Sequence, residues 1–307
     1  MKKFLKKVFL SGIACAAVMV LGLVVRVTIS QAELNGVFGV PDGTEVLCIG
    51  NSHTGCTWYE APEFKNRVFW SSATGFATHY MRFREFERRG VLDSGIRYCI
   101  LDCDGPSMTF FSTEELKMRF GINLPFAWRY ADCLPVGLCN LALYVLGHSG
   151  HEFYFTGETP PGQVAGWTTR TKQEQELNIA RQYCKDFHSD WKTGYPEGWQ
   201  DVFLWMVGDI KNRCDAHGVR LICFAAPLTS ASPARTNRMI WERESRMIDR
   251  VKAIGVEYYD FRLACADCRF RDSHHLLRDY SYEFTKRFFC DVLKLSKIPD
   301  NTVERHE

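Results

Sequence analysis

Short apolar runs alternate with amphipathic segments in two parts of the chain, residues 45–104 and 219–295. The apolar runs stop at turn residues such as Gly50-Asn51 and Pro227, which is typical of strands buried on both faces of a sheet. The segments between them carry apolar residues at helical spacing, and several are followed by glycine. We therefore predict strands at 45–49, 67–71, 96–101, 219–226 and 256–261, and helices at 76–89, 199–217, 237–254 and 281–295.

Strands that alternate with helices indicate an α/β fold with a central parallel sheet. The prediction is a three-layer α/β/α sandwich of the flavodoxin-like type, with helices on both faces of the sheet. Because crossovers between parallel strands are right-handed, the carboxyl ends of the strands meet at one edge. Loops that carry chemistry are expected at that edge.

The segment 105–198 does not follow this alternation. It is rich in glycine, proline and aromatic residues and has one clear helix start, the capping box of Ser112 and Glu115. A crossover between parallel strands needs far fewer residues. We predict one domain at 44–298 with an insertion at 105–198 over the carboxyl edge of the sheet. A linker at 33–43 precedes the domain, and a polar tail at 299–307 follows it.

The first 32 residues have the pattern of a membrane-targeting segment. Lysines near the start precede an uncharged run at 8–25, which as a helix would be about 27 Å long, close to the thickness of a bilayer core. One alternative is an uncleaved signal anchor, and the other is a signal peptide cleaved near Ala32. In both cases the domain would be extracytoplasmic, either membrane-anchored through the N-terminal helix or secreted.

Charge and cysteine content narrow the choice of partners only slightly. The formal net charge of +2 provides no strong field that would favour nucleic acid, and we predict no nucleic-acid partner.

The chain has 13 cysteines, and an exported protein can form disulfides. Cys48, Cys99 and Cys223 lie in predicted core strands, where thiols pack as small apolar groups. The better disulfide candidates are Cys103, Cys133, Cys139, Cys184, Cys214, Cys265, Cys268 and Cys290.

Two chain-distant motifs could together carry nucleophilic chemistry. Gly50-Asn51-Ser52-His53 follows the first predicted strand, and Asp272-Ser273-His274-His275 precedes the last predicted helix. A serine hydroxyl needs a base to take its proton and an acid to orient that base. The simpler reading of each motif alone is structural, since a Gly-Asn-Ser turn is common and an aspartate before a helix often acts as a cap.

Together the two motifs resemble the SGNH, or GDSL, hydrolase superfamily, over most of 45–104 and 219–295. The resemblance implies Ser52 as nucleophile, His275 as base and Asp272 as its orienting partner, with Asn51 and His53 in support. It also implies that the backbone N–H groups of Ser52 and Gly75 stabilise the oxyanion.

One block departs from the family pattern. The family often has an asparagine after its third strand, whereas this chain has Asp102-Cys103-Asp104-Gly105. Asn123 or Asn140 from the insertion could supply the missing donor. With this departure, the chain resembles the envelope esterase and O-acyltransferase branches of the superfamily more than its other members.

The resemblance therefore implies an extracytoplasmic serine esterase or O-acyltransferase. Its substrate would be an acyl ester, above all an acetyl ester, of a carbohydrate, and the reaction would pass through an acyl-serine intermediate. The alternative is an inactive member of the fold that binds carbohydrate or assists envelope assembly.

Two further readings involve the Cys265-x-x-Cys268 pair. With His274 and His275 it could form a zinc site, and alone it could act in thiol redox chemistry. We expect a disulfide there instead, and predict no metal and no cofactor.

Overall fold

The computed structural model describes residues 38–70, 76–105 and 199–295, together with 9–13, 17–18, 20–22 and 24–25. The chain divides into two compact units, Met1–Gly39 with Ser112–Thr156 and Val40–Phe111 with Gly157–Glu307. The sheet and the candidate site belong to the second unit.

The short described pieces between residues 9 and 25 are helical. Within the described ranges, no helix combines the length and the apolar character that crossing a bilayer requires. Much of the predicted targeting segment at 1–32 lies outside the described residues, as do the tail at 299–307 and nearly all of the insertion at 105–198. These assignments stay predictions.

The five predicted strands form one parallel sheet in the order β2-β1-β3-β4-β5. Val46 at the start of β1 pairs with Asn66 of β2 and Tyr98 of β3, so these strands begin in register. Each strand lies within about two residues of its predicted bounds, and the predicted three-layer α/β class is confirmed. The strands are β1 (Val46–Gly50), β2 (Asn66–Trp70), β3 (Tyr98–Asp102), β4 (Arg220–Ala225) and β5 (Glu257–Asp260).

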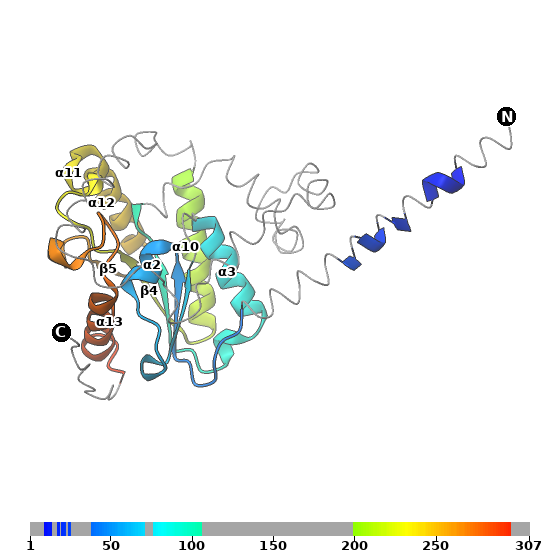
Figure 1. Cartoon of the computed structure of the whole chain (residues 1–307), viewed down its shortest axis with the longest axis horizontal. Coiled ribbons are helices and arrows are strands. Elements are labelled where there is room, and N and C mark those ends of the chain that lie inside the picture. Colours follow the sequence, from blue (N-terminus) through cyan, green and yellow to red (C-terminus); the bar gives the residue numbers. More distant parts are fainter. Residues whose placement is uncertain are drawn as a thin grey trace. The chain divides into compact units, whose positions relative to one another are not determined.

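Helices cover both faces of the sheet (Figure 1). Val46 and Cys48 of β1 belong to a core cluster that includes residues of α13 (Arg278–Asp291). Side chains alternate along a strand, so the buried Leu47 and Ile49 face the opposite layer. There α3 (Phe76–Arg88) contacts β1 and β3, and α10 (Trp199–Ala216) contacts β4. Burial on both faces explains why the central strands β1 and β3 are almost entirely apolar, whereas the edge strands β2 and β5 include polar residues.

The four predicted helices are present, with shifted ends. Asn237 was predicted to begin a helix and is instead the N-cap of α12 (Arg238–Ala253), accepting hydrogen bonds from Met239 and Ile240 at 3.0 and 3.4 Å. Two short helices, α2 (Ser52–Thr57) and α11 (Pro233–Thr236), were not predicted. Single 3₁₀ turns occur at Pro62–Phe64, Val91–Asp93 and Asp267–Arg269.

The disulfide expectation is wrong for the described cysteines. Cys103, Cys214, Cys265, Cys268 and Cys290 are free thiols. Cys103 and Cys214 are buried, as are Cys223 and Cys99, which were expected to pack in the core and do so. A buried thiol behaves as a small apolar group, and for Cys103 and Cys214 that role replaces the predicted bridge. Cys133, Cys139 and Cys184 lie outside the described residues.

Candidate active site

Ser52 occupies the first position of α2, directly beyond the carboxyl end of β1. Asn51 is the N-cap, and its side-chain oxygen accepts a hydrogen bond from the His53 N–H at 2.7 Å. Position 50, before this cap, requires glycine. A Cβ at Gly50 would lie 1.8 Å from the Thr54 hydroxyl oxygen and 2.5 Å from the Cβ of Asp102. The Ser52 hydroxyl therefore stands at the sheet edge on a helix start whose position is tightly constrained.

Helix α13 holds α2 in place from the other side. The Thr285 hydroxyl accepts a hydrogen bond from the Tyr59 N–H at 2.8 Å, and the Ser281 hydroxyl donates to the Cys56 carbonyl. Trp58, at the end of α2, is 1% exposed and packs among aromatic rings of α13 and its surroundings. These contacts connect the segment that carries Ser52 to the segment that follows His275.

The loop that carries Asp272 and His275 is a tight, paired turn. The Arg271 N–H donates to the His275 carbonyl at 2.7 Å, and Phe270 forms an antiparallel bridge with Leu276. Beyond the end of β4, the Thr229 N–H and hydroxyl both donate to the Ser273 carbonyl at 3.0 Å. Backbone hydrogen bonds thus hold the turn against the carboxyl edge of the sheet.

A chain of two hydrogen bonds connects Ser52, His275 and Asp272. His275 Nε2 is 3.0 Å from Ser52 Oγ, and His275 Nδ1 is 2.8 Å from Asp272 Oδ2. The other carboxylate oxygen of Asp272 accepts the backbone N–H groups of His274 and His275 at 3.1 and 2.9 Å. This is the arrangement in which an imidazole can take a proton from a serine hydroxyl.

The charge states of the pair suit that transfer. Burial lowers the pKa of His275, and the charge of Asp272 opposes this only in part. Burial alone would raise the pKa of Asp272, but the charge and hydrogen bond of His275 outweigh it and lower that pKa well below its usual range. Near neutral pH the imidazole is therefore neutral and the carboxylate ionised, which is the state that a general base requires.

A second imidazole–carboxylate pair lies behind Ser52. His53 Nδ1 hydrogen-bonds to Asp104, and both side chains are buried. Burial opposes protonation of His53, but the charge and hydrogen bond of Asp104 raise its pKa to about 9. Asp102, at the end of β3, accepts the Asp104 N–H at 3.1 Å, and burial raises the pKa of its carboxyl. A buried cation–anion pair therefore lies next to the candidate nucleophile.

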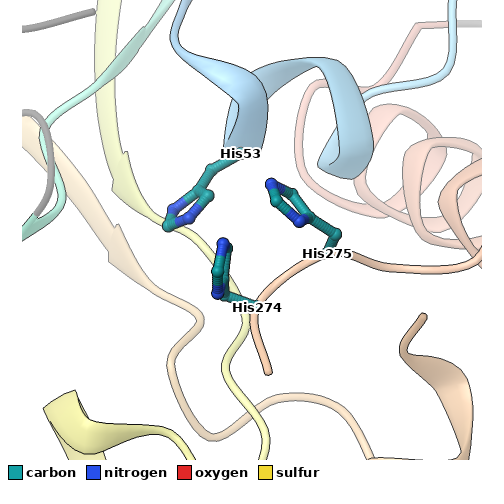
Figure 2. A group of neighbouring side chains, drawn as sticks. All are labelled: His53, His274 and His275. Atoms are coloured by element: carbon teal, nitrogen blue, oxygen red, sulfur yellow. The ribbon is translucent and has the colours of Figure 1, made fainter. Parts of the chain in front are cut away.

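Three histidine rings meet at this point (Figure 2). His53 projects from α2, whereas His274 and His275 come from the paired turn. The ring centroids are 4.8 Å apart for His53 and His274, 5.5 Å for His53 and His275, and 4.1 Å for the two adjacent residues. Within the described part of the chain, these three residues form the group that could hold a metal ion, with ligand atoms within 4.8 Å of one another.

The structure thus brings Ser52, Asp272 and His275 together and makes Asn51 the cap of α2. It pairs His53 with Asp104, which the sequence motifs did not predict. Gly75, Asn123 and Asn140 lie outside the described residues, so the remaining oxyanion donors stay predictions. Cys265 and Cys268 are free thiols and are not members of the histidine group.

Sequence reasoning missed Asp104 as a site residue, and it considered His274 only as a zinc ligand together with Cys265, Cys268 and His275. A signal was available for Asp104, because it follows the end of a central parallel strand and must lie near the residues that follow β1. For His274 the signal was weaker, since neighbouring residues in a loop have no fixed periodicity that would predict their direction.

Comparisons with known proteins add little to this picture. No family model matches the chain, and no curated protein matches it by sequence. Among solved structures, a GDSL-like lipase from Bacteroides thetaiotaomicron aligns with a TM-score of 0.41 and 10% sequence identity, over 86% of this chain and 96% of that one. The fold class therefore rests on the observed sheet and helices, and any function rests on the site.

Proposed function

We propose that this protein is an SGNH-like serine esterase or O-acyltransferase. The observation that carries the proposal is the 3.0 Å separation between His275 Nε2 and Ser52 Oγ, with Asp272 2.8 Å behind the imidazole. Two segments more than two hundred residues apart, each with a motif that resembles that superfamily, supply this arrangement.

In the proposed reaction, Ser52 attacks the carbonyl carbon of an ester while His275 accepts the hydroxyl proton. The imidazolium then donates that proton to the departing alcohol, which leaves an acyl-serine. Water or a second hydroxyl compound, deprotonated by His275, then attacks the acyl-serine. His275 returns that proton to Ser52 Oγ as the bond to the acyl carbon breaks, which releases the acid or the new ester. Asp272 keeps the Nδ1 proton of His275 in place and stabilises the imidazolium.

The Ser52 backbone N–H is the proposed oxyanion donor within the described residues. It opens the first turn of α2, where N–H groups lack an intrahelical acceptor. We expect Gly75 to supply a second N–H. Removing one such donor typically costs about 3 kcal/mol of barrier stabilisation.

For the substrate we propose a small acyl ester, above all acetyl, carried by a carbohydrate outside the cytoplasm. The support is the predicted targeting segment at 1–32 and the departure at Asp102–Asp104 from the usual asparagine block. Release of acetate from an acetylated polysaccharide, compared with acetyl transfer to added sugar, would distinguish esterase from transferase.

The direct test uses the full chain with p-nitrophenyl acetate and a fluorophosphonate probe. The wild type should release p-nitrophenol and be labelled at Ser52, whereas Ser52→Ala should do neither while keeping its unfolding temperature. Ser230→Ala is a matched control, since that exposed hydroxyl hydrogen-bonds only Asp267 among the described residues. Hydrolysis that survives in Ser52→Ala at the wild-type rate would show that Ser52 is not the nucleophile.

A further inference from the structure

The three imidazoles of His53, His274 and His275 are close to the geometry of a metal site. One ring nitrogen from each lies within 4.8 Å of the other two. Nitrogen ligands of a tetrahedral zinc ion lie about 2 Å from the metal, and therefore about 3.4 Å from one another. Closing the three rings onto one ion needs displacements on the order of 1 Å, which side-chain rotations in two segments can provide.

The outer contacts of the rings are those of metal-binding histidines. The Nδ1 atom of His53 contacts Asp104, that of His275 contacts Asp272 at 2.8 Å, and that of His274 contacts the Ser273 hydroxyl at 2.7 Å. Metal-binding histidines almost always hydrogen-bond through their second nitrogen to a carboxylate or another oxygen, which orients the ring. All three rings have such a partner on Nδ1, so Nε2 is the atom that each would direct at an ion. His53 is protonated in the metal-free protein, and its Nε2 proton is released to solvent when the ion binds.

The charges around the cluster also suit a dication. Asp104 and Asp272 are both within hydrogen-bonding distance of a ring, and together they can balance two positive charges. Protein cysteine ligands are not needed, because three histidines and an open fourth position suffice for zinc. Soft and borderline metals such as Zn²⁺ prefer imidazole nitrogen, whereas Mg²⁺ and Ca²⁺ prefer oxygen.

We propose that His53, His274 and His275 bind one zinc-class divalent cation through their Nε2 atoms, and that the bound ion inhibits the enzyme. His275 Nε2 is the same atom that lies 3.0 Å from Ser52 Oγ. A lone pair that coordinates a metal cannot accept a proton, so metal binding and base catalysis exclude each other. The inhibition rests on the proposed function, whereas the binding site does not.

The binding test uses the chelator-treated full chain and two probes, Zn²⁺ in calorimetry and Co²⁺ in visible spectroscopy. The wild type should bind one equivalent, with the visible bands of tetrahedral nitrogen coordination. His274→Ala should weaken binding by more than ~100-fold, since changes to outer-shell partners alone cost 10–100-fold. His217→Ala is the matched control, because that histidine lies at the end of α10 and contacts Asp93.

Two more variants separate the possible outcomes. Ser52→Ala should keep Zn²⁺ binding although its hydrolysis is lost, and Asp104→Asn should weaken binding by about 10–100-fold. In the wild type, half-inhibition of p-nitrophenyl acetate hydrolysis should occur at the measured dissociation constant and be reversed by chelator. The hydrolysis that His274→Ala retains should be insensitive to Zn²⁺ at that concentration.

Several results would overturn the proposal. One is the absence of stoichiometric Zn²⁺ binding in a folded wild type. Another is a His274→Ala variant that binds Zn²⁺ with the same affinity as the wild type. A third is a Co²⁺ spectrum with thiolate charge-transfer bands, which would identify the exposed Cys268 as a ligand. Binding without any ester hydrolysis in the wild type would instead refute the proposed function and leave the metal site standing. If His274→Ala does not fold, the Co²⁺ spectrum of Ser52→Ala still decides the ligand type.

Discussion

Replacing Asp272 with asparagine should abolish catalysis while leaving the fold intact. In the native structure one carboxylate oxygen accepts the N–H groups of His274 and His275 at 3.1 and 2.9 Å, and the other faces His275 Nδ1 at 2.8 Å. The single oxygen of asparagine is needed by the two N–H groups, so its NH₂ group must face Nδ1. Nδ1 then has to be an acceptor, and the imidazole proton moves to Nε2.

The magnitude follows from that change of tautomer. With a proton on Nε2, His275 can only donate toward Ser52 Oγ, 3.0 Å away, and cannot accept the hydroxyl proton. The same substitution in serine proteases lowers kcat about 10⁴-fold, which corresponds to about 5 kcal/mol of barrier height. Stability should also fall, because the low pKa of Asp272 means that the folded protein favours its charged form. The two backbone hydrogen bonds remain and keep the turn in place, and the hydrogen bonds from Arg271 that the substitution removes are long, at 3.3 and 3.4 Å.

The assay is steady-state hydrolysis of p-nitrophenyl acetate, with thermal unfolding measured on the same samples. Asp267→Asn is the matched control, since Asp267 accepts hydrogen bonds from Ser230 near the same loop but does not contact His275. The reasoning fails if kcat of Asp272→Asn stays within tenfold of the wild type while the variant is folded at the assay temperature. It also fails if Asp267→Asn loses as much activity, because the effect would then come from a general disturbance of the loop.

Three further predictions concern the support of the site. Burial would raise the pKa of Glu85, but Arg88 and Arg89 lower it from 4.5 to about 2. The resulting stabilisation is present above pH 4.5 and is lost as the pH falls toward 2. The unfolding temperature of Glu85→Gln, which lies below that of the wild type at neutral pH, should therefore approach the wild-type value over that range. A deficit that stays constant would show that charge is not the cause. Gly50→Ala should displace α2 and lower kcat, because its Cβ would lie 1.8 Å from a hydroxyl oxygen of that helix, and an unchanged kcat would show that the contact relaxes freely. Trp58→Ala should cost about 3–5 kcal/mol in urea unfolding, whereas Trp58→Phe should cost much less, since it keeps a ring and removes an indole N–H that no described residue accepts; equal losses would contradict this.

Most of the fold was predictable because its central strands are buried on both faces. Runs such as 46–50 and 98–102 are apolar almost throughout and end at turn residues, so their place in a parallel sheet follows from the pattern alone. Helix α2 was not predictable by the same means. Its sequence Ser-His-Thr-Gly-Cys-Thr consists of weak helix formers, and the helix exists because Asn51 caps it and α13 packs against it.

The candidate site was predictable where a rule of topology connects distant residues. Parallel strands place their carboxyl ends at one edge, and this rule together with the family resemblance of the two motifs suggested that Ser52 and His275 could meet. The same rule applied to β3 places Asp104 beside them, although the family resemblance pointed to an asparagine in that block. The direction of the His274 ring depends on the paired turn and its contact with Ser273, which no sequence pattern specifies.

Asp272 shows that a structural and a catalytic role can belong to one side chain. From sequence, an aspartate three residues before a histidine and close to a helix could be either a cap or the third member of a triad. It does not cap α13, whose N-cap is Leu277. One of its oxygens binds the backbone of residues 274 and 275, and that contact leaves the other oxygen directed at the His275 ring. Because the hydrogen bonds that shape the turn also aim the carboxylate, the orientation of the base is fixed by the fold of four consecutive residues. A change that loosens the turn must therefore misalign the imidazole as well.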